Sequence, residues 1–456
     1  MGFFKAYDMR GTFGSDFDLS TVEKVGRSLP KVVASGKWLV GRDCRLTSEA
    51  VRDALVRGLS QSGAEVLDIG LCTTPMVYFF TAETGADASV MVTASHNPPS
   101  DNGLKVSKRG AMPVGYADGL DMVERLVSAD SDPVSAPDAG ASVRETSAKW
   151  VGEYVKWMKE RAPDFSNLRY AVDCSNGMAS ILAKELFPGA IIINDVLDGG
   201  FPAHSPNPLK AEAREQAAAL VREHSLDCAV IFDGDADRCM FVDERGGFVQ
   251  PDYLVPVVAK GAAAMAGESL AGAKIIHDVR TSRGAISAIE AMGAEAVMVP
   301  VGHAFAKPAL RGSGAICGGE LAGHYYFRDF HCCDSGVLAA LMVLGEVARA
   351  KREGRSFGEM MKPVSSVYAN SGELNFKVED KDAAMVRMLE AAERRFPREI
   401  SRSEIDGVRV EYAQGWFNVR KSNTEAYLRL IVECKDKDTL SDWVSVLKNA
   451  CLPMTA

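Results

Sequence analysis

The sequence lacks any hydrophobic run of the roughly 20 residues that a membrane-spanning helix needs. Residues 1–6 lack the apolar stretch and cleavage site of a signal peptide, and Ala6 breaks the myristoylation pattern. Ten cysteines are present without the paired spacing of a metal site. We therefore expect a cytoplasmic protein with reduced thiols and no membrane partner.

The sequence also has no excess of basic residues. The chain has 52 Lys and Arg against 61 Asp and Glu, a net charge of −9 with neutral histidines. This balance argues against nucleic acid as a partner, and it means that a local cluster of Arg and Lys must hold any anionic substrate. The rest is ordinary for a soluble globular protein: 47 % hydrophobic and 25 % charged, over 456 residues that suggest about three domains.

An apolar strand followed by an aspartate, a turn and a helical stretch occurs three times, at 37–43, 170–173 and 274–278. Three copies of one unit predict three related α/β domains. The last segment differs, because strands at 408–412 and 427–433 precede a helix at 440–450. This order is typical of a smaller α+β domain.

Two segments mark boundaries between these domains. Small and polar residues interrupt the helical pattern at 129–140, and a second boundary lies near 243–247. We predict domains at 1–145, 146–247, 248–363 and 364–456.

A candidate nucleophile follows the apolar run 88–92, in the segment Thr93-Ala94-Ser95-His96-Asn97-Pro98. Ser95 is therefore expected at the carboxyl end of a buried strand, where α/β proteins place their ligands. No Gly-x-Ser-x-Gly elbow surrounds it, so acyl-transfer hydrolysis fits poorly. The turn-rich stretch 98–105 predicts a loop that carries Lys105.

A second cluster, Asp233-Gly234-Asp235-Ala236-Asp237-Arg238, follows the apolar run 228–232. Three carboxylates at alternate positions of a tight loop can point at one hard cation, and proteins hold Mg²⁺ with carboxylates together with phosphate oxygens. Arg238 can reach the same anion. The sequence therefore predicts a magnesium site with an anionic partner rather than a solvated acidic turn.

Two other interpretations of this cluster were weighed. An EF-hand needs glycine at the sixth loop position, where Arg238 stands, and a helix rather than a strand before the loop. A haloacid-dehalogenase-like phosphotransferase would make Asp233 the phosphoryl acceptor, which leaves the Ser95 segment without a role. The first is rejected and the second stays open as an alternative.

Six segments in this order resemble the α-D-phosphohexomutase family, in its phosphomannomutase/phosphoglucomutase branch. The resemblance implies mixed sheets, an active site in a central cleft, and a monomer or homodimer. It also implies interconversion of hexose 1-phosphate and hexose 6-phosphate, of mannose and/or glucose, with hexose 1,6-bisphosphate as intermediate and activator. The segments are Tyr7-Asp8-Met9-Arg10-Gly11, Thr93 to Pro98, Asp233 to Arg238, Gly302-His303, Gly319-Glu320-Leu321-Ala322-Gly323-His324 and Arg420-Lys421-Ser422-Asn423-Thr424-Glu425.

The resemblance assigns catalytic roles. Ser95 would carry the phosphoryl group, and Mg²⁺ would bind its phosphate together with Asp233, Asp235 and Asp237. Arg10 and Lys105 match candidates for general base and acid, with His303 nearby. We rank Lys105 first, because lysine can be tuned toward neutral pH whereas arginine hardly deprotonates. His96 adjoins the nucleophile on an extended loop, so we expect it to point away and to anchor the loop, with an electrostatic role left open.

Sugar and phosphate contacts are implied for the remaining residues. Glu320 can accept hydrogen bonds from two adjacent hydroxyls in both orientations of the intermediate. Ala322 replaces the serine usual in the family, which removes one expected sugar contact. Leu321 differs from the glutamine of glucosamine-phosphate mutases, which argues against an amino sugar; phosphoglucosamine mutase is kept as the alternative function. Substrate binding is assigned to Tyr7, Arg238, Glu320, His324, Arg420, Ser422, Asn423 and Thr424.

Overall fold

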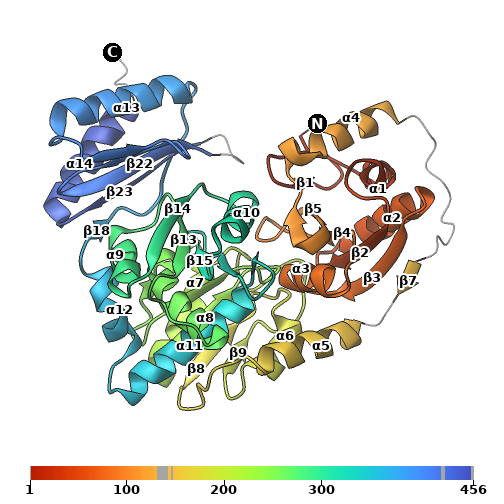
Figure 1. The fold of residues 1–456 in the computed structure, drawn as a ribbon, viewed down its shortest axis with the longest axis horizontal. Helices are drawn as coiled ribbons and strands as arrows, with labels where there is room; N and C mark the ends of the chain where they lie inside the picture. The colour runs from red at the N-terminus through yellow and green to blue at the C-terminus, as the bar shows by residue number, and fades with distance from the viewer. Residues whose placement is uncertain (1, 131–141, 145–146, 423–426, 453–456) are drawn as a thin grey trace.

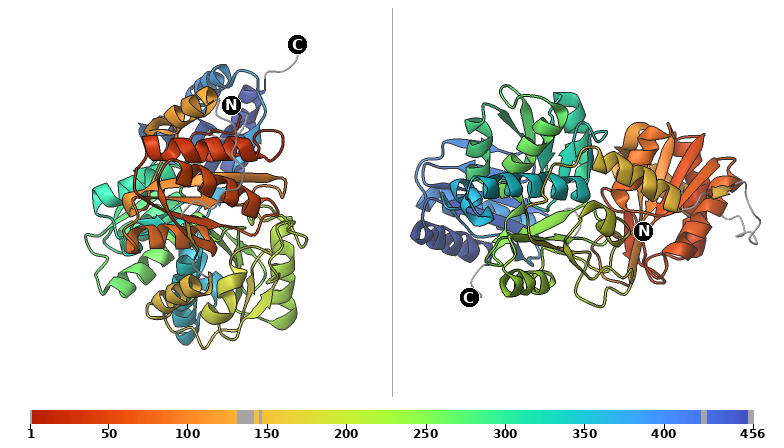
Figure 2. Two further views of the ribbon diagram at one scale, coloured as in Figure 1. Left: turned by 90° about the vertical axis from the view of Figure 1, so that its right-hand side faces the viewer. Right: turned by 90° about the horizontal axis from the view of Figure 1, so that it is seen from below.

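The computed structural model describes residues 2–130, 142–144, 147–422 and 427–452. Within these ranges the chain forms four β-sheets in succession, each with its own helices (Figure 1). The first and fourth sheets lie on opposite sides of the second and third (Figures 1 and 2). No helix in the described part of the chain is both long and apolar enough to cross a membrane.

The first sheet has the strand order β1-β5-β4-β2-β3-β7, with β6 beside β5. Lys105 lies in β5, so the loop predicted at 98–105 is wrong from residue 101 onward. The backbone there pairs with β4 on one side and β1 on the other, and this pairing outweighs the local turn preference. The elements are β1 Met9–Thr12, α1 Leu19–Val32, β2 Lys37–Arg42, α2 Ser48–Gln61, β3 Glu65–Leu71, α3 Thr74–Glu83, β4 Ala88–Val92, β5 Asp101–Lys108, β6 Met112–Pro113, α4 Leu120–Ala129 and β7 Ser142–Arg144.

The second sheet has the order β12-β11-β10-β8-β9 and the third β14-β13-β15-β16-β17. Elements of the second are α5 Ser147–Lys159, β8 Tyr170–Asp173, α6 Ser180–Leu186, β9 Ile191–Ile193, α7 Glu212–His224, β10 Cys228–Phe232, β11 Cys239–Val242 and β12 Phe248–Val249. Those of the third are α8 Val255–Ala266, β13 Lys274–Asp278, α9 Arg283–Ala291, β14 Glu295–Val299, α10 His303–Ser313, β15 Cys317–Gly319, β16 Tyr325–Phe327, β17 Cys333–Asp334, α11 Gly336–Arg352 and α12 Phe357–Ser365.

The fourth sheet is antiparallel, with the order β18-β23-β22-β21-β20 and β19 beside β23. Two helices accompany it, as expected for a smaller α+β unit. Its elements are β18 Ala369–Asn370, β19 Leu374–Phe376, α13 Lys381–Arg395, β20 Ser401–Ser403, β21 Val408–Glu411, β22 Gly415–Lys421, β23 Leu428–Cys434 and α14 Lys437–Cys451.

The first three sheets share one plan. Each has three adjacent parallel strands followed by an antiparallel one: β3-β2-β4-β5, β9-β8-β10-β11 and β14-β13-β15-β16. In each, the middle parallel strand leads to an aspartate, namely Asp43, Asp173 or Asp278, whose carboxylate accepts the backbone N–H two residues on. This confirms the predicted α/β class with three related domains and a smaller fourth.

The same plan positions the candidate site. The Ser95 segment joins β4 to β5, the aspartate loop joins β10 to β11, and the Glu320 loop joins β15 to β16. All three therefore follow the last parallel strand of their sheet, at its carboxyl end, where α/β proteins bind ligands. The exact domain boundaries stay a prediction, and most of the predicted linker at 129–140 lies outside the described residues.

The hydrophobic cores divide differently from the sheets. The second and third sheets share one large cluster, to which Phe232 and Ile275 both belong, and α11 is buried along most of its length against α8. Helix α3 and one side of the first sheet, including Leu39, belong to the same cluster. The other side of the first sheet packs around a separate core that includes Trp38, and the fourth sheet around one that includes Trp443. The unit that carries the Ser95 segment is thus packed directly against the unit that carries the aspartate loop.

Candidate active site

The Ser95 segment is held by a single arginine, Arg45. Its guanidinium donates to the backbone carbonyls of Ser95 at 2.8 Å, Asn97 at 2.7 Å, Pro98 at 2.6 Å and Asp101 at 2.8 Å. The side chain is fully buried, and its charge is paired with Asp43 at 3.3 Å. Buried carbonyls need donors, so Arg45 fixes the path of the chain around Ser95.

Ser95 itself has a left-handed backbone, with φ of 51°. This conformation is uncommon outside glycine and, for serine, requires support from its surroundings. Besides Arg45, the Ser95 N–H donates to Thr93 Oγ1 at 2.8 Å. The result is a buried hydroxyl directed at the aspartate loop of the second sheet.

Ser95 and the aspartate loop are in direct contact. Ser95 Oγ donates to Asp233 Oδ2 at 3.0 Å, and oxygens of Asp233, Asp235 and Asp237 lie within 4.8 Å of one another. Gly234 makes this approach possible, because a Cβ at that position would lie 2.6 Å from the carbonyl oxygen of Ser95. The structure thus brings together the nucleophile and the metal loop that the sequence predicted.

The three carboxylates fit a hard divalent cation. Asp235 Oδ1 and Asp237 Oδ1 are buried without a hydrogen-bond partner, and the donor set consists of oxygens, which Mg²⁺ prefers. Lys105 Nζ lies 2.9 Å from Asp235 Oδ2 and 2.6 Å from Asp237 Oδ2. Burial, opposed by the charge of Arg238 and reinforced by Asp237, raises the pKa of Asp233 to about 8. A bound cation would stabilise the ionised form instead.

His96 points toward the nucleophile, not away from it. Its Nδ1 lies 3.1 Å from Ser95 Oγ, so the expectation that it points away is wrong. Adjacent side chains diverge on extended backbone, but the left-handed turn at Ser95 breaks that alternation. Burial and the positive charges of Arg238 and Arg10 hold the pKa of His96 well below its usual range. His96 is therefore a neutral partner of the serine hydroxyl.

Arg10 and Lys105 reach the same site from the first sheet. Arg10 pairs with Asp8 at 2.5 Å and donates to Asn97 Oδ1 at 3.1 Å. Burial disfavours the charge of Lys105, but Asp235 and Asp237 outweigh it and raise the pKa of the ammonium group above its usual value. Lys105 is a cation in this arrangement, and its role as proton carrier stays a prediction.

The third sheet contributes Glu320 and His324. Glu320 is buried, and its Oε1 accepts from the Gly302 N–H at 3.1 Å and the Tyr326 hydroxyl at 3.0 Å. Burial raises the pKa of this carboxyl. His324 Nδ1 lies 3.0 Å from Asp334 and 3.8 Å from Asp237. Burial opposes protonation of His324, but these carboxylates prevail and raise its pKa.

Tyr7 and His303 lie next to each other, although they come from the first and third domains. Their rings are 6.2 Å apart between centroids in an edge-on arrangement. Burial and the nearby Lys307 charge lower the pKa of His303 to about 3, so the imidazole is neutral at physiological pH.

The predicted phosphate loop is described only in part. Arg420 is buried and lies 3.7 Å from Asp406 and 3.8 Å from Glu373. The Ser422 N–H donates to the Tyr427 carbonyl at 2.9 Å. Asn423 and Thr424 lie outside the described residues, so their assignment stays a prediction.

Sequence reasoning missed four buried residues around the site. Besides Arg45, Thr74 at the start of α3 donates to Asp235 Oδ2 at 2.6 Å. Asp334 holds His324, and Lys307 in turn pairs with Asp334 at 2.9 Å while lying over the Tyr78 ring. A signal existed for Arg45, which stands two residues after the repeated strand-end aspartate, as Arg280 does in the third sheet.

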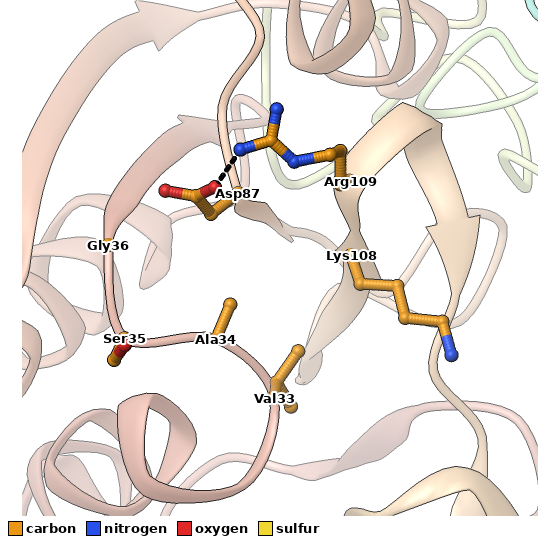
Figure 3. Close-up of a pocket in the computed structure, with 7 residues that line it drawn as sticks. All are labelled: Val33, Ala34, Ser35, Gly36, Asp87, Lys108 and Arg109. Carbon is orange, nitrogen blue, oxygen red and sulfur yellow. Dashed lines mark hydrogen bonds and ion pairs between the residues drawn. The ribbon is translucent and has the colours of Figure 1, made fainter.

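A surface hollow of about 410 Å³ in the first domain lies away from these residues (Figure 3). Gly36 and Asp87 precede β2 and β4, so this hollow is at the amino end of the parallel strands, opposite Ser95. Arg109 pairs with Asp87 across it. It is lined by Val33, Ala34, Ser35, Gly36, Asp87, Lys108 and Arg109.

Replacing Arg45 with lysine is expected to loosen the Ser95 segment. A lysine ammonium offers three donors from one point and cannot serve four carbonyls. Unsatisfied buried carbonyls cost about 1–3 kcal/mol each, so amide hydrogen exchange over 93–101 should accelerate by about ten- to a hundredfold. The matched control is Arg42→Lys, since Arg42 is largely buried but donates to one backbone carbonyl, that of Asp43 at 3.2 Å, and pairs with Glu49 at 3.5 Å. An unchanged rate of amide hydrogen exchange in Arg45→Lys would contradict the conclusion that Arg45 holds the Ser95 segment in place.

Four family models match in order, described as phosphoglucomutase/phosphomannomutase alpha/beta/alpha domain I over 1–132, domain II over 152–247, domain III over 250–368 and C-terminal domain over 373–449. Together they span nearly the whole chain and each of the four sheets.

Individual relatives agree with the family models. A phosphomannomutase of Salmonella montevideo is 36 % identical over 444 residues, covering 95 % of this chain and 94 % of that protein. A protein of Xanthomonas campestris named phosphohexose mutases is 35 % identical over 436 residues, with 95 % of both covered. The crystal structure of a phosphoglucomutase/phosphomannomutase family protein from Burkholderia thailandensis is similar with a TM-score of 0.81 and 28 % identity, covering 98 % of this chain and 96 % of that one. The chain therefore belongs to the phosphoglucomutase/phosphomannomutase family.

Proposed function

We propose that this protein is a hexose phosphate mutase that interconverts hexose 1-phosphate and hexose 6-phosphate, with mannose and/or glucose as the sugar. The observation that carries the proposal is the 3.0 Å contact between Ser95 Oγ and Asp233 within the three-aspartate cluster. This contact supports Ser95 as the nucleophile beside a carboxylate cluster that suits a divalent cation, in a member of a mutase family. Phosphoryl transfer needs this combination of positioning and charge neutralisation.

The chemistry consists of two phosphoryl transfers. In the first, the bond between Ser95 Oγ and phosphorus breaks and Ser95 Oγ takes up a proton, while the free hydroxyl of the hexose monophosphate loses its proton and takes the phosphoryl group. The resulting 1,6-bisphosphate turns over in the site. In the second, Ser95 Oγ loses its proton and takes the other phosphoryl group, and the sugar oxygen that this group leaves takes up a proton. Free bisphosphate serves as activator, because it can phosphorylate Ser95 again after an intermediate has escaped.

The aspartate loop would hold Mg²⁺ through Asp233, Asp235 and Asp237 together with the phosphate on Ser95. When bound, the ion neutralises oxygens of the transferring group. Arg238 supports the same region by donating from Nε to Asp233 Oδ2 at 2.9 Å. Arg45 and Gly234 keep Ser95 at the distance that transfer requires.

Proton transfer is assigned to side chains that surround Ser95. Lys105 and Arg10 are the proposed acid and base, with His303 as a further candidate. The neutral His96 lies with Nδ1 3.1 Å from Ser95 Oγ and is placed to share a hydrogen bond with the serine oxygen when the phosphate has left. A bound ion would replace Lys105 as the partner of Asp235 and Asp237, and the ammonium group would then be available to the sugar hydroxyl.

Glu320 and His324 bind the sugar. Its non-transferring phosphate is bound by Arg420, Ser422, Asn423 and Thr424. The Glu320 backbone N–H donates to the His324 carbonyl at 3.0 Å, so one hydrogen-bonded turn carries both residues. Tyr7 and Arg238 complete the proposed substrate contacts. A cytoplasmic location and a monomeric or homodimeric state remain predictions.

The dehalogenase-like alternative fits less well. Asp233 is engaged by both Ser95 and Arg238 and is not free to attack phosphorus. All four domains match mutase models. Phosphoglucosamine mutase activity remains testable in the same assay.

Glucose 1-phosphate and mannose 1-phosphate are both expected to be substrates, because Glu320 contacts hydroxyls remote from C2, where the two sugars differ. Their kcat/KM values should agree within about a hundredfold, or 2.7 kcal/mol. The assay compares both sugars and glucosamine 1-phosphate, each with a catalytic amount of 1,6-bisphosphate. Release of inorganic phosphate without isomerisation would indicate a phosphatase, and tight binding without either would indicate a binding protein.

A further inference from the structure

Three arginines converge on one carboxylate beside the proposed phosphate site. Arg429 donates to Glu373 Oε2 at 2.9 Å, Arg280 donates to Glu373 Oε1 at 3.1 Å, and Arg420 lies 3.8 Å from the same oxygen. The Glu373 side chain is 20 % exposed, so solvent can reach it. Arg280 comes from the third domain and the other three residues from the fourth, so the cluster spans their junction.

The three arginines differ in how firmly they are held. Arg280 has its own counter-ion, because Asp278 accepts from both its Nε and Nη2, at 3.2 and 2.7 Å. Arg420 lies 3.7–3.8 Å from Asp406 and Glu373, beyond hydrogen-bond distance to either carboxylate. Its Nε is buried without a hydrogen-bond partner. Among the described residues, none supplies an acceptor to this Nε, so Arg420 is poised for a further anion.

The arginine cluster adjoins the Glu320 loop, which is proposed to bind the sugar. Asp278 Oδ2, paired with Arg280, also accepts the backbone N–H of Leu321 at 2.9 Å. Leu321 follows Glu320 directly, and the nearby Glu320 charge is one of those that raise the pKa of Arg280. A hexose held by Glu320 would therefore place one of its phosphates within reach of these arginines.

We propose that Glu373 is an internal competitor of the substrate phosphate: in the free enzyme its carboxylate pairs with Arg429 and lies beside Arg420, and it gives way to the phosphate when the phosphate binds these arginines. This inference rests on the proposed function. A phosphate dianion offers the planar acceptor pattern that guanidinium groups prefer, as a carboxylate does. Two such anions cannot share the same arginines without strong repulsion.

This competition has a use in the reaction. The active site must retain the 1,6-bisphosphate, but the arginines must also release each of its phosphate groups so that the intermediate can turn. A site of arginines alone would bind phosphate tightly and slow that exchange. Glu373 lowers the cost of release, because it replaces the phosphate as counter-ion when the phosphate leaves.

The test is Glu373→Gln, which keeps the shape of the side chain and removes its charge. In the Ser95→Ala background, where the nucleophile is absent, the Kd of glucose 1-phosphate and of inorganic phosphate is measured by titration calorimetry. Both should fall by about five- to tenfold, as expected for one removed like charge near a partly buried site. With Ser95 present, KM should fall as well, while kcat stays the same or decreases because release is slower.

The matched control is Glu411→Gln. Glu411 is also 20 % exposed and pairs with Arg283 and Arg409 at the same domain junction, so the global change in charge is identical. Its Kd values should match those of the parent. Arg420→Ala should show the opposite change, with weaker binding. Should Glu373→Gln fail to fold, Glu373→Asp withdraws the carboxylate by one methylene, and about two- to threefold tighter binding is expected.

Equal or weaker binding by Glu373→Gln would overturn the inference, since Glu373 would then position the arginines instead of competing with the ligand. This outcome is distinct from failure of the proposed function. That failure would appear in the unmodified protein as absence of isomerisation, whereas the calorimetric comparison does not depend on turnover.

Discussion

Ser95→Ala is expected to abolish formation of a phosphoenzyme and to lower isomerase activity at least about a thousandfold, as loss of the nucleophile does in other covalent mechanisms. The physical reason is positional. Ser95 Oγ is directed at the aspartate cluster and lies 3.0 Å from Asp233. A water molecule that took the place of this hydroxyl would not be held in position, because it would not be attached to the backbone that Arg45 fixes.

The measurement is incorporation of phosphate from labelled 1,6-bisphosphate, followed by peptide mapping. Label should be found in the peptide that contains Ser95 and should resist hydroxylamine, as a serine phosphate does. The matched control is Ser100→Ala, because Ser100 lies in the same segment but is exposed and contacts Asp101 at 3.3 Å. A hydroxylamine-labile label that survives Ser95→Ala and disappears in Asp233→Asn would instead support the dehalogenase-like mechanism.

Much of the site could be predicted because its loops follow buried strands. An apolar run of about five residues before a polar cluster is a local signal, and it located both Ser95 and the three aspartates. The spacing of the aspartates also predicted their convergence, which is observed within 4.8 Å. These features depend on residues that are close together in the sequence.

Features that depend on distant partners could not be predicted in this way. Lys105 was expected in a loop because prolines, Asn102 and Gly103 precede it, but β5 forms since it lies between β1 and β4. His96 was expected to point away, yet the conformation of Ser95 is imposed by Arg45, 50 residues earlier. The support of His324 by Asp334 and Lys307 likewise joins separate elements, α10 and β17, whose proximity no sequence pattern indicates.

The second large effect is expected for Asp235→Asn. Loss of one carboxylate from a three-carboxylate site weakens Mg²⁺ binding and leaves the charge of the transferring phosphoryl group less neutralised, so kcat should fall by about a hundred- to a thousandfold. Binding of hexose monophosphate should change little, because its proposed contacts are Glu320, His324 and Arg420. Excess chelator should lower the activity of the unmodified enzyme in the same way.

A second measurement separates a metal role from a purely structural one. Mg²⁺ binds the folded state, so saturating Mg²⁺ should raise the thermal midpoint of the unmodified protein, and this increase should be lost in Asp235→Asn. Without Mg²⁺ the variant should be about as stable as its parent. The substitution leaves Lys105 with Asp237 at 2.6 Å and removes repulsion among buried carboxylates, which offsets the lost pairing with Thr74.

Asp195→Asn, a surface change at a residue that pairs with Lys184 at 3.4 Å, serves as control and should keep the full response to Mg²⁺. Full activity of Asp235→Asn, or an unchanged response of its thermal midpoint to Mg²⁺, would show that the aspartate loop holds Ser95 by hydrogen bonding alone.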